Sequence, residues 1–139
     1  MRCNDVLLGG SFGNTLEGGA GDDVLRGNNG NDILQGSDNS NSVEKDTLTR
    51  GRGADTFVLS TSNSGSFYLG DGFATILDFK WWEGDTIQVV GSASDYRLDT
   101  TQNFSGTSVL DTAIYRGNDL IAVVQDTVNV IPAFDFRFG

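Results

Sequence analysis

The feature that most constrains this chain is a nine-residue repeat that runs through its first half. Four units are GGSFGNTLE (9–17), GGAGDDVLR (18–26), GNNGNDILQ (27–35) and, after an interruption, RGRGADTFV (50–58). The end of an earlier unit, NDVLL (4–8), precedes them, and DTLT (46–49) closes a unit lengthened by GSDNSNSVEK (36–45). A fixed period of this kind indicates stacked turns rather than one round core.

One column of the repeat carries large apolar side chains. The eighth position of successive units holds Leu7, Leu16, Leu25, Leu34, Leu48 and Phe57. Positions seven to nine can form a very short strand, whose middle residue points inward while its neighbours point outward. Glycine, asparagine and aspartate in the first six positions suit turns that need a positive φ. The period therefore predicts a flattened coil with two walls, in which units two apart stack about 4.8 Å from each other.

A second column is acidic. The sixth position holds Asp5, Asn14, Asp23, Asp32, Asp46 and Asp55. Stacking would place like charges at close range on both sides of the coil, and a hard divalent cation between the turns would remove the repulsion. Ca²⁺ accepts six to eight oxygens in flexible geometry, whereas Mg²⁺ needs a tighter octahedron, so we predict calcium ahead of magnesium.

The composition excludes several other kinds of site. Nine Lys and Arg against nineteen Asp and Glu give a net charge of −10, which disfavours nucleic acid and other polyanions as partners. The chain has no histidine and one cysteine, Cys3, which excludes imidazole zinc sites, internal disulfides and Cys–His nucleophiles. No apolar run approaches the length of about 18 to 20 residues that spans a bilayer. Oxygen is the ligand chemistry that remains.

These residues resemble the RTX family of secreted proteins, whose nonapeptide Gly-Gly-x-Gly-x-Asp-x-apolar-x forms a calcium-binding parallel β-helix. Residues 18–26 match every fixed position of it. GADTFVL (53–59) and ATILDFKWWEGDTIQVV (74–90) are similar to the region that closes the roll in that family, and residues 108–130 to the tail of its cyanobacterial-type members.

The repeat, the resemblance and the alternating apolar segments of the second half together predict an all-β fold. We expect a parallel β-roll of nonapeptide repeats over residues 1–59, with an inserted loop at 36–45. Residues 60–139 should form a C-terminal cap of longer, mostly antiparallel β-strands, continuous with the roll in one domain.

The resemblance also implies which atoms hold calcium. In that family one turn supplies the carbonyls of its first, third and fifth positions, and the turn two units later supplies its second and fourth carbonyls and its sixth-position carboxylate. Carried over residue by residue, a first site joins Gly27, Asn29 and Asn31 to Gly51, Gly53 and Asp55, with Asp32 available from the first turn. A second site joins Gly9, Ser11 and Gly13 to Asn28, Gly30 and Asp32. A third would join Gly18, Ala20 and Asp22 to the turn of Asp46, with Asp38 or Glu44 as substitutes, and the sixth-position Asn14 and Asp23 complete the predicted set.

Three residues depart from the family pattern. Phe12 replaces a fourth-position glycine, Asn14 replaces an aspartate, and Arg50 replaces a first glycine. The second site is therefore the least regular. We expect Arg50 and Arg52 to offset nearby acids rather than to bind an anion.

Two groups in the second half invite other interpretations. Trp81 and Trp82 could stack on a sugar, although a packing role is the more common use of such a pair. Asp78, Glu83 and Asp85 could be imagined as the acid and base of a glycosidase, but such residues in an acidic chain are normally solvated or bind metal. We therefore expect that the chain is not an enzyme.

The function that the resemblance implies is a module that folds on binding Ca²⁺ outside the cell. It would serve as the C-terminal secretion and folding module of an exported protein, with type I secretion machinery as its partner. The alternative is a calcium-rigidified extracellular spacer, or an adhesive or carbohydrate-binding accessory module with a glycan partner. The short first unit, of whose turn Asn4 and Asp5 keep the pattern, suggests a chain cut from a longer protein or a naturally short copy.

Overall fold

The structure is a computed structural model, and it describes residues 4–19, 21–37, 45–61, 65–66, 72–101, 110–117, 119–125, 130 and 135–138. In this part of the chain, strands dominate, with two short 3₁₀ helices, η1 (Trp81–Glu83) and η2 (Ala93–Asp95). No helix among these residues is long and apolar enough to cross a membrane.

Each repeat contributes one short strand at its seventh to ninth positions, as the period predicts. These strands are β1 (Val6–Leu8), β2 (Thr15–Glu17), β3 (Val24–Arg26), β4 (Ile33–Gln35), β5 (Lys45–Thr49) and β6 (Thr56–Val58). Apart from β5, all of them have three residues, because the glycine-rich turn takes up the other six positions of the unit.

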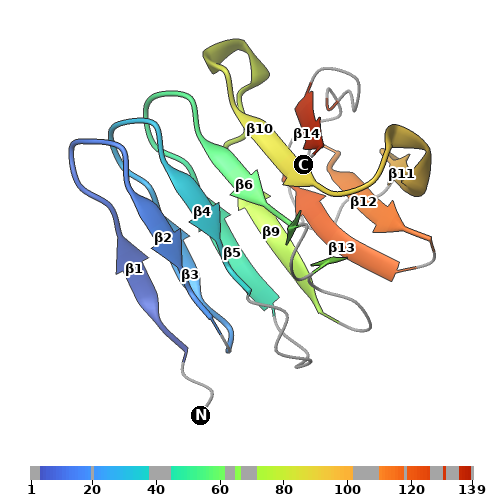
Figure 1. The fold of residues 1–139 in the computed structure, drawn as a ribbon, viewed down its shortest axis with the longest axis horizontal. Coiled ribbons are helices and arrows are strands. Elements are labelled where there is room, and N and C mark those ends of the chain that lie inside the picture. The colour runs from blue at the N-terminus through green and yellow to red at the C-terminus, as the bar shows by residue number, and fades with distance from the viewer. Residues whose placement is uncertain are drawn as a thin grey trace.

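The strands stack into two parallel walls (Figure 1). β1, β3 and β5 belong to wall 1, and β2, β4 and β6 to wall 2. Units two apart pair in register, with Leu7 opposite Leu25 in wall 1 and Leu16 opposite Leu34 in wall 2. Leu25 faces Leu48 across the insertion, so the extra residues leave the register unchanged. The predicted coil is confirmed.

Both walls continue past the repeats. β9 (Phe73–Leu77) extends wall 1 in parallel with β5, and β10 (Thr86–Val89) extends wall 2 in parallel with β6. Beyond them, β13 (Asp119–Val124) and β14 (Phe136–Phe138) add one further parallel strand to each wall. With β11 (Tyr96–Asp99) and β12 (Thr112–Arg116) at the end of wall 1, the sheet orders become β1-β3-β5-β9-β13-β12-β11 and β14-β10-β6-β4-β2.

The cap is less antiparallel than the sequence predicts. Among the described residues, antiparallel pairing joins β11 (Tyr96–Asp99), β12 (Thr112–Arg116) and β13, and also the short β7 (Ser60–Thr61) and β8 (Gly65–Ser66). Without further strands, β5 and β6 would each leave a row of unpaired backbone groups. β9 and β10 pair with these rows in parallel, in the direction in which the coil already runs. The all-β fold with a parallel roll is confirmed, and its parallel part extends further than the repeat.

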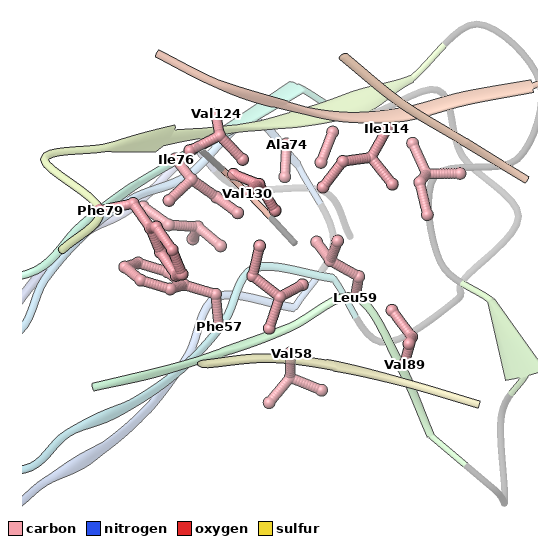
Figure 2. Packing of buried hydrophobic residues seen from close by; sticks show 14 of the residues in the cluster. Phe57, Val58, Leu59, Ala74, Ile76, Phe79, Val89, Ile114, Val124 and Val130 are labelled. Carbon is pink, nitrogen blue, oxygen red and sulfur yellow. The ribbon is translucent and has the colours of Figure 1, made fainter. Parts of the chain in front are cut away.

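The core lies between the two walls. The eighth-position column supplies four fully buried side chains, Leu25, Leu34, Leu48 and Phe57. Leu7 and Leu16, at the open end of the roll, are partly buried against them. Toward the cap the column joins a wider apolar cluster, in which the ring of Phe57 packs against that of Phe79 with 6.1 Å between centroids (Figure 2).

Truncation of one inward leucine tests this architecture. Leu34→Ala removes a side chain that is 0% exposed, so we expect a loss of about 2–5 kcal/mol in the free energy of unfolding. The matched control Leu8→Ala alters an outward leucine that is 63% exposed and should cost less than about 0.5 kcal/mol. Denaturant unfolding at saturating calcium measures both, and equal losses would contradict the inward column.

Candidate calcium sites between the turns

The turns that lead into wall 2 lie along one edge of the roll, at the upper side of Figure 1, and we call this edge 2. They are residues 9–14, 27–32, 50–55 and 80–85, which lead into β2, β4, β6 and β10. Gly30 and Gly53, both at fourth positions, have φ of 104° and 108°. An L side chain rarely adopts this conformation, which explains the glycine there. The turns that lead into wall 1 form edge 1.

Four of the sixth-position carboxylates accept a hydrogen bond from the turn before them. Oδ1 of Asp32 accepts the backbone N–H of Asn14 at 2.7 Å, and Oδ1 of Asp55 accepts that of Asp32 at 2.8 Å. On edge 1 the same bond, 2.7 Å long, runs from Asp5 N to Asp23 and from Asp23 N to Asp46. The acidic column is thus a ladder of side-chain to backbone hydrogen bonds, in which one oxygen of each of these carboxylates is already satisfied.

A second ladder of hydrogen bonds is formed by fifth-position side chains, which accept from the backbone of the following turn instead of the preceding one. Oδ1 of Asn31 accepts the N–H of Ala54 in the following turn at 2.9 Å. Edge 1 has equivalent bonds of 2.9 Å from Asp22 N to Asn4 and from Lys45 N to Asp22. This role of the fifth position was not predicted from the sequence, although the recurrence of Asn4, Asp22 and Asn31 at that position was its signal.

Backbone carbonyls occupy the space between successive turns. The carbonyls of Asn31 and Gly27 point back toward the preceding turn, and that of Gly30 points forward toward Gly53. A Cβ on Gly53 would lie 2.5 Å from Gly30 O, and one on Gly13 would lie 2.6 Å from Asn31 O. First- and fifth-position carbonyls therefore face the turn before, whereas the family pattern pairs them with the turn after.

The structure brings the predicted partner turns together. The turns of the first site adjoin through a parallel bridge between Asn29 and Arg52, and an open groove of about 470 Å³ crosses three turns of edge 2. Its lining residues are Gly9, Gly10, Ser11, Asn28, Asn29, Gly51 and Arg52. In the third site, a Cβ on Gly18 would lie 2.8 Å from the carbonyl oxygen of Gly36 in the next turn. Ala20, Asp38 and Glu44 lie outside the described residues, and the individual ligand sets remain predictions.

Asp32 shows whether a cation fits between these turns. Its Oδ2 is buried and accepts no hydrogen bond from the described residues, and a Cβ on Gly27 would lie 2.5 Å from it. Burial raises the pKa of Asp32 above its usual range, and hydrogen bonds from Asn14 only partly counteract this effect. A buried carboxylate oxygen without a partner is costly, and a hard cation is the group that stabilises it. The residues present fit calcium.

Most ligands at such a site would be carbonyl oxygens. Among the described residues, no three Asp, Glu or Cys side chains come close enough to form a metal-binding group by themselves. The two pairs of turns formed by residues 9–14, 27–32 and 50–55 each combine a sixth-position carboxylate with backbone carbonyls that lie between the turns. Calcium accepts backbone carbonyls and tolerates irregular geometry, which suits this arrangement.

Asp85 extends the acidic column of edge 2 by one further carboxylate. This extension was not predicted from the sequence. Oδ1 of Asp85 accepts the N–H of Asp55 at 2.9 Å, as the ladder requires. The signal was the segment DTI (85–87), which repeats the Asp-Thr-apolar order of DTF (55–57), but no glycine-rich turn precedes it. Burial raises the pKa of Asp85 above its usual range, and the pKa of Asp55 is raised for the same main reason.

The other groups singled out in the second half are placed as follows. Asp78 is ion-paired with Lys80, and Glu83 and Asp85 are ion-paired with Arg50. Trp82 is 63% exposed on η1, and the side chain of Trp81 lies outside the described part of the structure.

The geometry defines a calcium-binding β-roll, and comparisons with known proteins agree. Residues 8–43 match the RTX calcium-binding nonapeptide repeat in four copies, so this segment is similar to an RTX repeat region. Calcium is the ion that such repeats bind. No curated protein matches the chain.

Among solved structures, the chain is similar to the solution structure of the AlgE6R3 subunit from the Azotobacter vinelandii mannuronan C5-epimerase. The identity is 25% and the TM-score 0.63, and the match covers 99% of this chain and 80% of that one. The likeness therefore extends through the cap as well as the repeats.

Substitution of Asp32 by its amide separates the ladder from the ion. In Asp32→Asn the amide oxygen can still accept the N–H of Asn14, but the buried charge is lost. We expect calcium affinity to fall about tenfold or more in calorimetry, because a charged ligand becomes neutral. Stability in chelator should be unchanged or higher, because an uncompensated buried charge is removed.

The control for this substitution is Glu17→Gln, which makes the same charge change on an exposed residue of β2. It should alter neither quantity. If Asp32→Asn destabilised the calcium-free chain and left calcium affinity intact, the carboxylate would serve the ladder alone.

Proposed function

We propose that this chain is a module that folds fully on binding calcium outside the cell, and that it assists the export and folding of the protein to which it belongs. The observation that carries the proposal is the buried Oδ2 of Asp32, which lies within a stack of carboxylates and has no hydrogen-bond partner in the described part of the chain. Without an ion the repeats bury negative charge, and with an ion the same oxygens become ligands.

The energetic basis is binding linkage. A ligand that binds only the folded state stabilises it by RT ln(1 + [L]/Kd) at each site. For extracellular sites with Kd of about 10⁻⁴ to 10⁻³ M, millimolar calcium adds roughly 0.4–1.4 kcal/mol per site. Several such contributions decide whether a roll built from three-residue strands is folded, because strands this short are weak on their own. Cytosolic calcium lies far below these constants and contributes almost nothing.

The net charge of −10 adds to this dependence on calcium. Self-repulsion of an acidic chain favours the expanded state when no cation is bound. An expanded polyanion can pass through a narrow exporter, and type I secretion machinery is the partner that the RTX repeats suggest. Folding would then follow export, where calcium is abundant.

Removal of calcium tests the proposal directly. In strong chelator we expect the amides of residues 4–37 to exchange hydrogen rapidly and the strand signal in circular dichroism to fall, and calcium should restore both. Magnesium at the same concentration is the control and should restore little, because it retains its water. Slow exchange throughout 4–37 in chelator would reject calcium-dependent folding.

A second candidate is an accessory module of a polysaccharide-modifying enzyme, and the likeness to a subunit of mannuronan C5-epimerase favours it. In this case the chain would hold a glycan near a catalytic domain on the same protein. Calorimetry with mannuronan and calcium distinguishes the two functions. Binding that is lost in Trp82→Ala, whose side chain is exposed, supports the accessory role, and no detectable binding leaves the secretion and folding role.

A further inference from the structure

The turn pair that joins the repeats to the cap differs from the pairs before it. At the first position of their units, the earlier turns of edge 2 have Gly9 and Gly27, and the turn 50–55 has Arg50. The Arg50 side chain is only 2% exposed, so a full positive charge is buried between the turns 50–55 and 80–85.

Oxygen atoms from both turns surround this guanidinium. Nη2 donates to Gly53 O at 2.7 Å and to Glu83 Oε1 at 3.1 Å. Nε lies 2.6 Å from Asp85 Oδ2 and 3.8 Å from Asp55 Oδ2, and its contact with Asp85 is an ion pair without hydrogen-bond geometry. One fourth-position carbonyl, two sixth-position carboxylates and a further carboxylate therefore converge on one cation. These are the oxygen types that a calcium ion between turns would take.

The pair of turns below offers a matched comparison. There Gly27 carries no side chain, and Asp32 Oδ2 is buried without a hydrogen-bond partner among the described residues. In the upper pair the equivalent carboxylate is Asp55, whose Oδ2 accepts the N–H of Gly51 at 3.2 Å and lies 3.8 Å from Arg50 Nε. Asp85 Oδ2, from the turn above, accepts the N–H of Lys80 at 2.9 Å and also lies against Arg50. In the upper pair, Arg50 thus supplies the positive charge beside the buried carboxylates, whereas in the lower pair no side chain at the first position supplies a charge to Asp32.

A guanidinium differs from a bound ion in two respects. It stays protonated at every pH at which proteins fold, and its covalent attachment makes its presence independent of the calcium concentration. A calcium ion in the same space would face this positive charge and would have to displace it from its oxygens.

We propose that Arg50 is the resident cation of the junction: its guanidinium takes the place of calcium between the turns 50–55 and 80–85. This pair binds no calcium, and β10 stays docked on β6 when calcium is absent. The inference rests on the proposed function only in that the other turn pairs bind calcium.

The test uses Arg50→Gly, which restores the first glycine of the repeat. Arg52→Gly is the matched control, because it makes the same charge change two residues away at an exposed position. The chain has two tryptophans, Trp81 and Trp82, and both belong to η1 in the upper turn. Tryptophan emission therefore reports on this junction specifically.

The first measurement is urea unfolding in chelator, followed by tryptophan emission. We expect the unmodified chain and Arg52→Gly to show the same cooperative transition, and Arg50→Gly to lose it or shift it to lower urea. Added calcium should restore the transition of Arg50→Gly. An identical transition for Arg50→Gly and Arg52→Gly in chelator would overturn the proposal.

The second measurement is the number of calcium ions bound per chain in calorimetry. Arg50→Gly should bind one more ion than the unmodified chain and Arg52→Gly, whereas Arg50→Lys, which keeps a tethered charge, should bind no additional ion. Equal stoichiometry for Arg50→Gly and Arg52→Gly would overturn the proposal. If the unmodified chain bound no calcium but kept its transition in chelator, the proposed function would fail and the role of Arg50 in holding the junction would stand.

Discussion

The structure depends on one interaction, the hydrogen bond that a sixth-position carboxylate accepts from the backbone N–H of the turn before it. This bond fixes the spacing of the turns, because Asp32 reaches Asn14 and Asp55 reaches Asp32 with nearly the same length. It also creates an electrostatic repulsion within the fold, because every additional turn buries another carboxylate in the same column. A cation bound between the turns would remove this repulsion, and the backbone carbonyls that lie there would supply further oxygen ligands.

The cation requirement differs from one turn pair to the next along edge 2. Between the turns of Asn14 and Asp32, the carboxylate of Asp32 keeps a buried oxygen that has no hydrogen-bond partner among the residues the structure describes. One pair further, Asp55 directs its second oxygen to the N–H of Gly51 at 3.2 Å. At the junction, Asp85 is held by Arg50. Among the described residues of edge 2, the carboxylate oxygen without a partner therefore lies in the repeats, whereas the carboxylate at the junction with the cap is paired with Arg50.

The sequence predicts the periodic part of this molecule well. The eighth-position column identified the buried residues from Leu25 to Phe57, and the unit length gave the register of the walls, even across the insertion. It did not identify Asp85 as a member of the acidic column, because the turn before it has tryptophans in place of glycines. The direction of the carbonyls depends on φ and ψ within each turn, and residue types alone do not specify it. The role of Arg50 likewise required knowing that residues 80–85 lie above it.

The alternation of strands between the walls has a consequence for how such chains can vary. β9 pairs with β5 and β10 pairs with β6, so the wall that each of these cap strands joins depends on the number of repeat units before it. Loss of a single unit would move all later strands to the opposite wall, whereas loss of two would shorten the roll and leave each strand on its side. One full turn of the coil is thus two nine-residue units, or 18 residues, and this is the change of length within the roll that keeps each later strand on its wall.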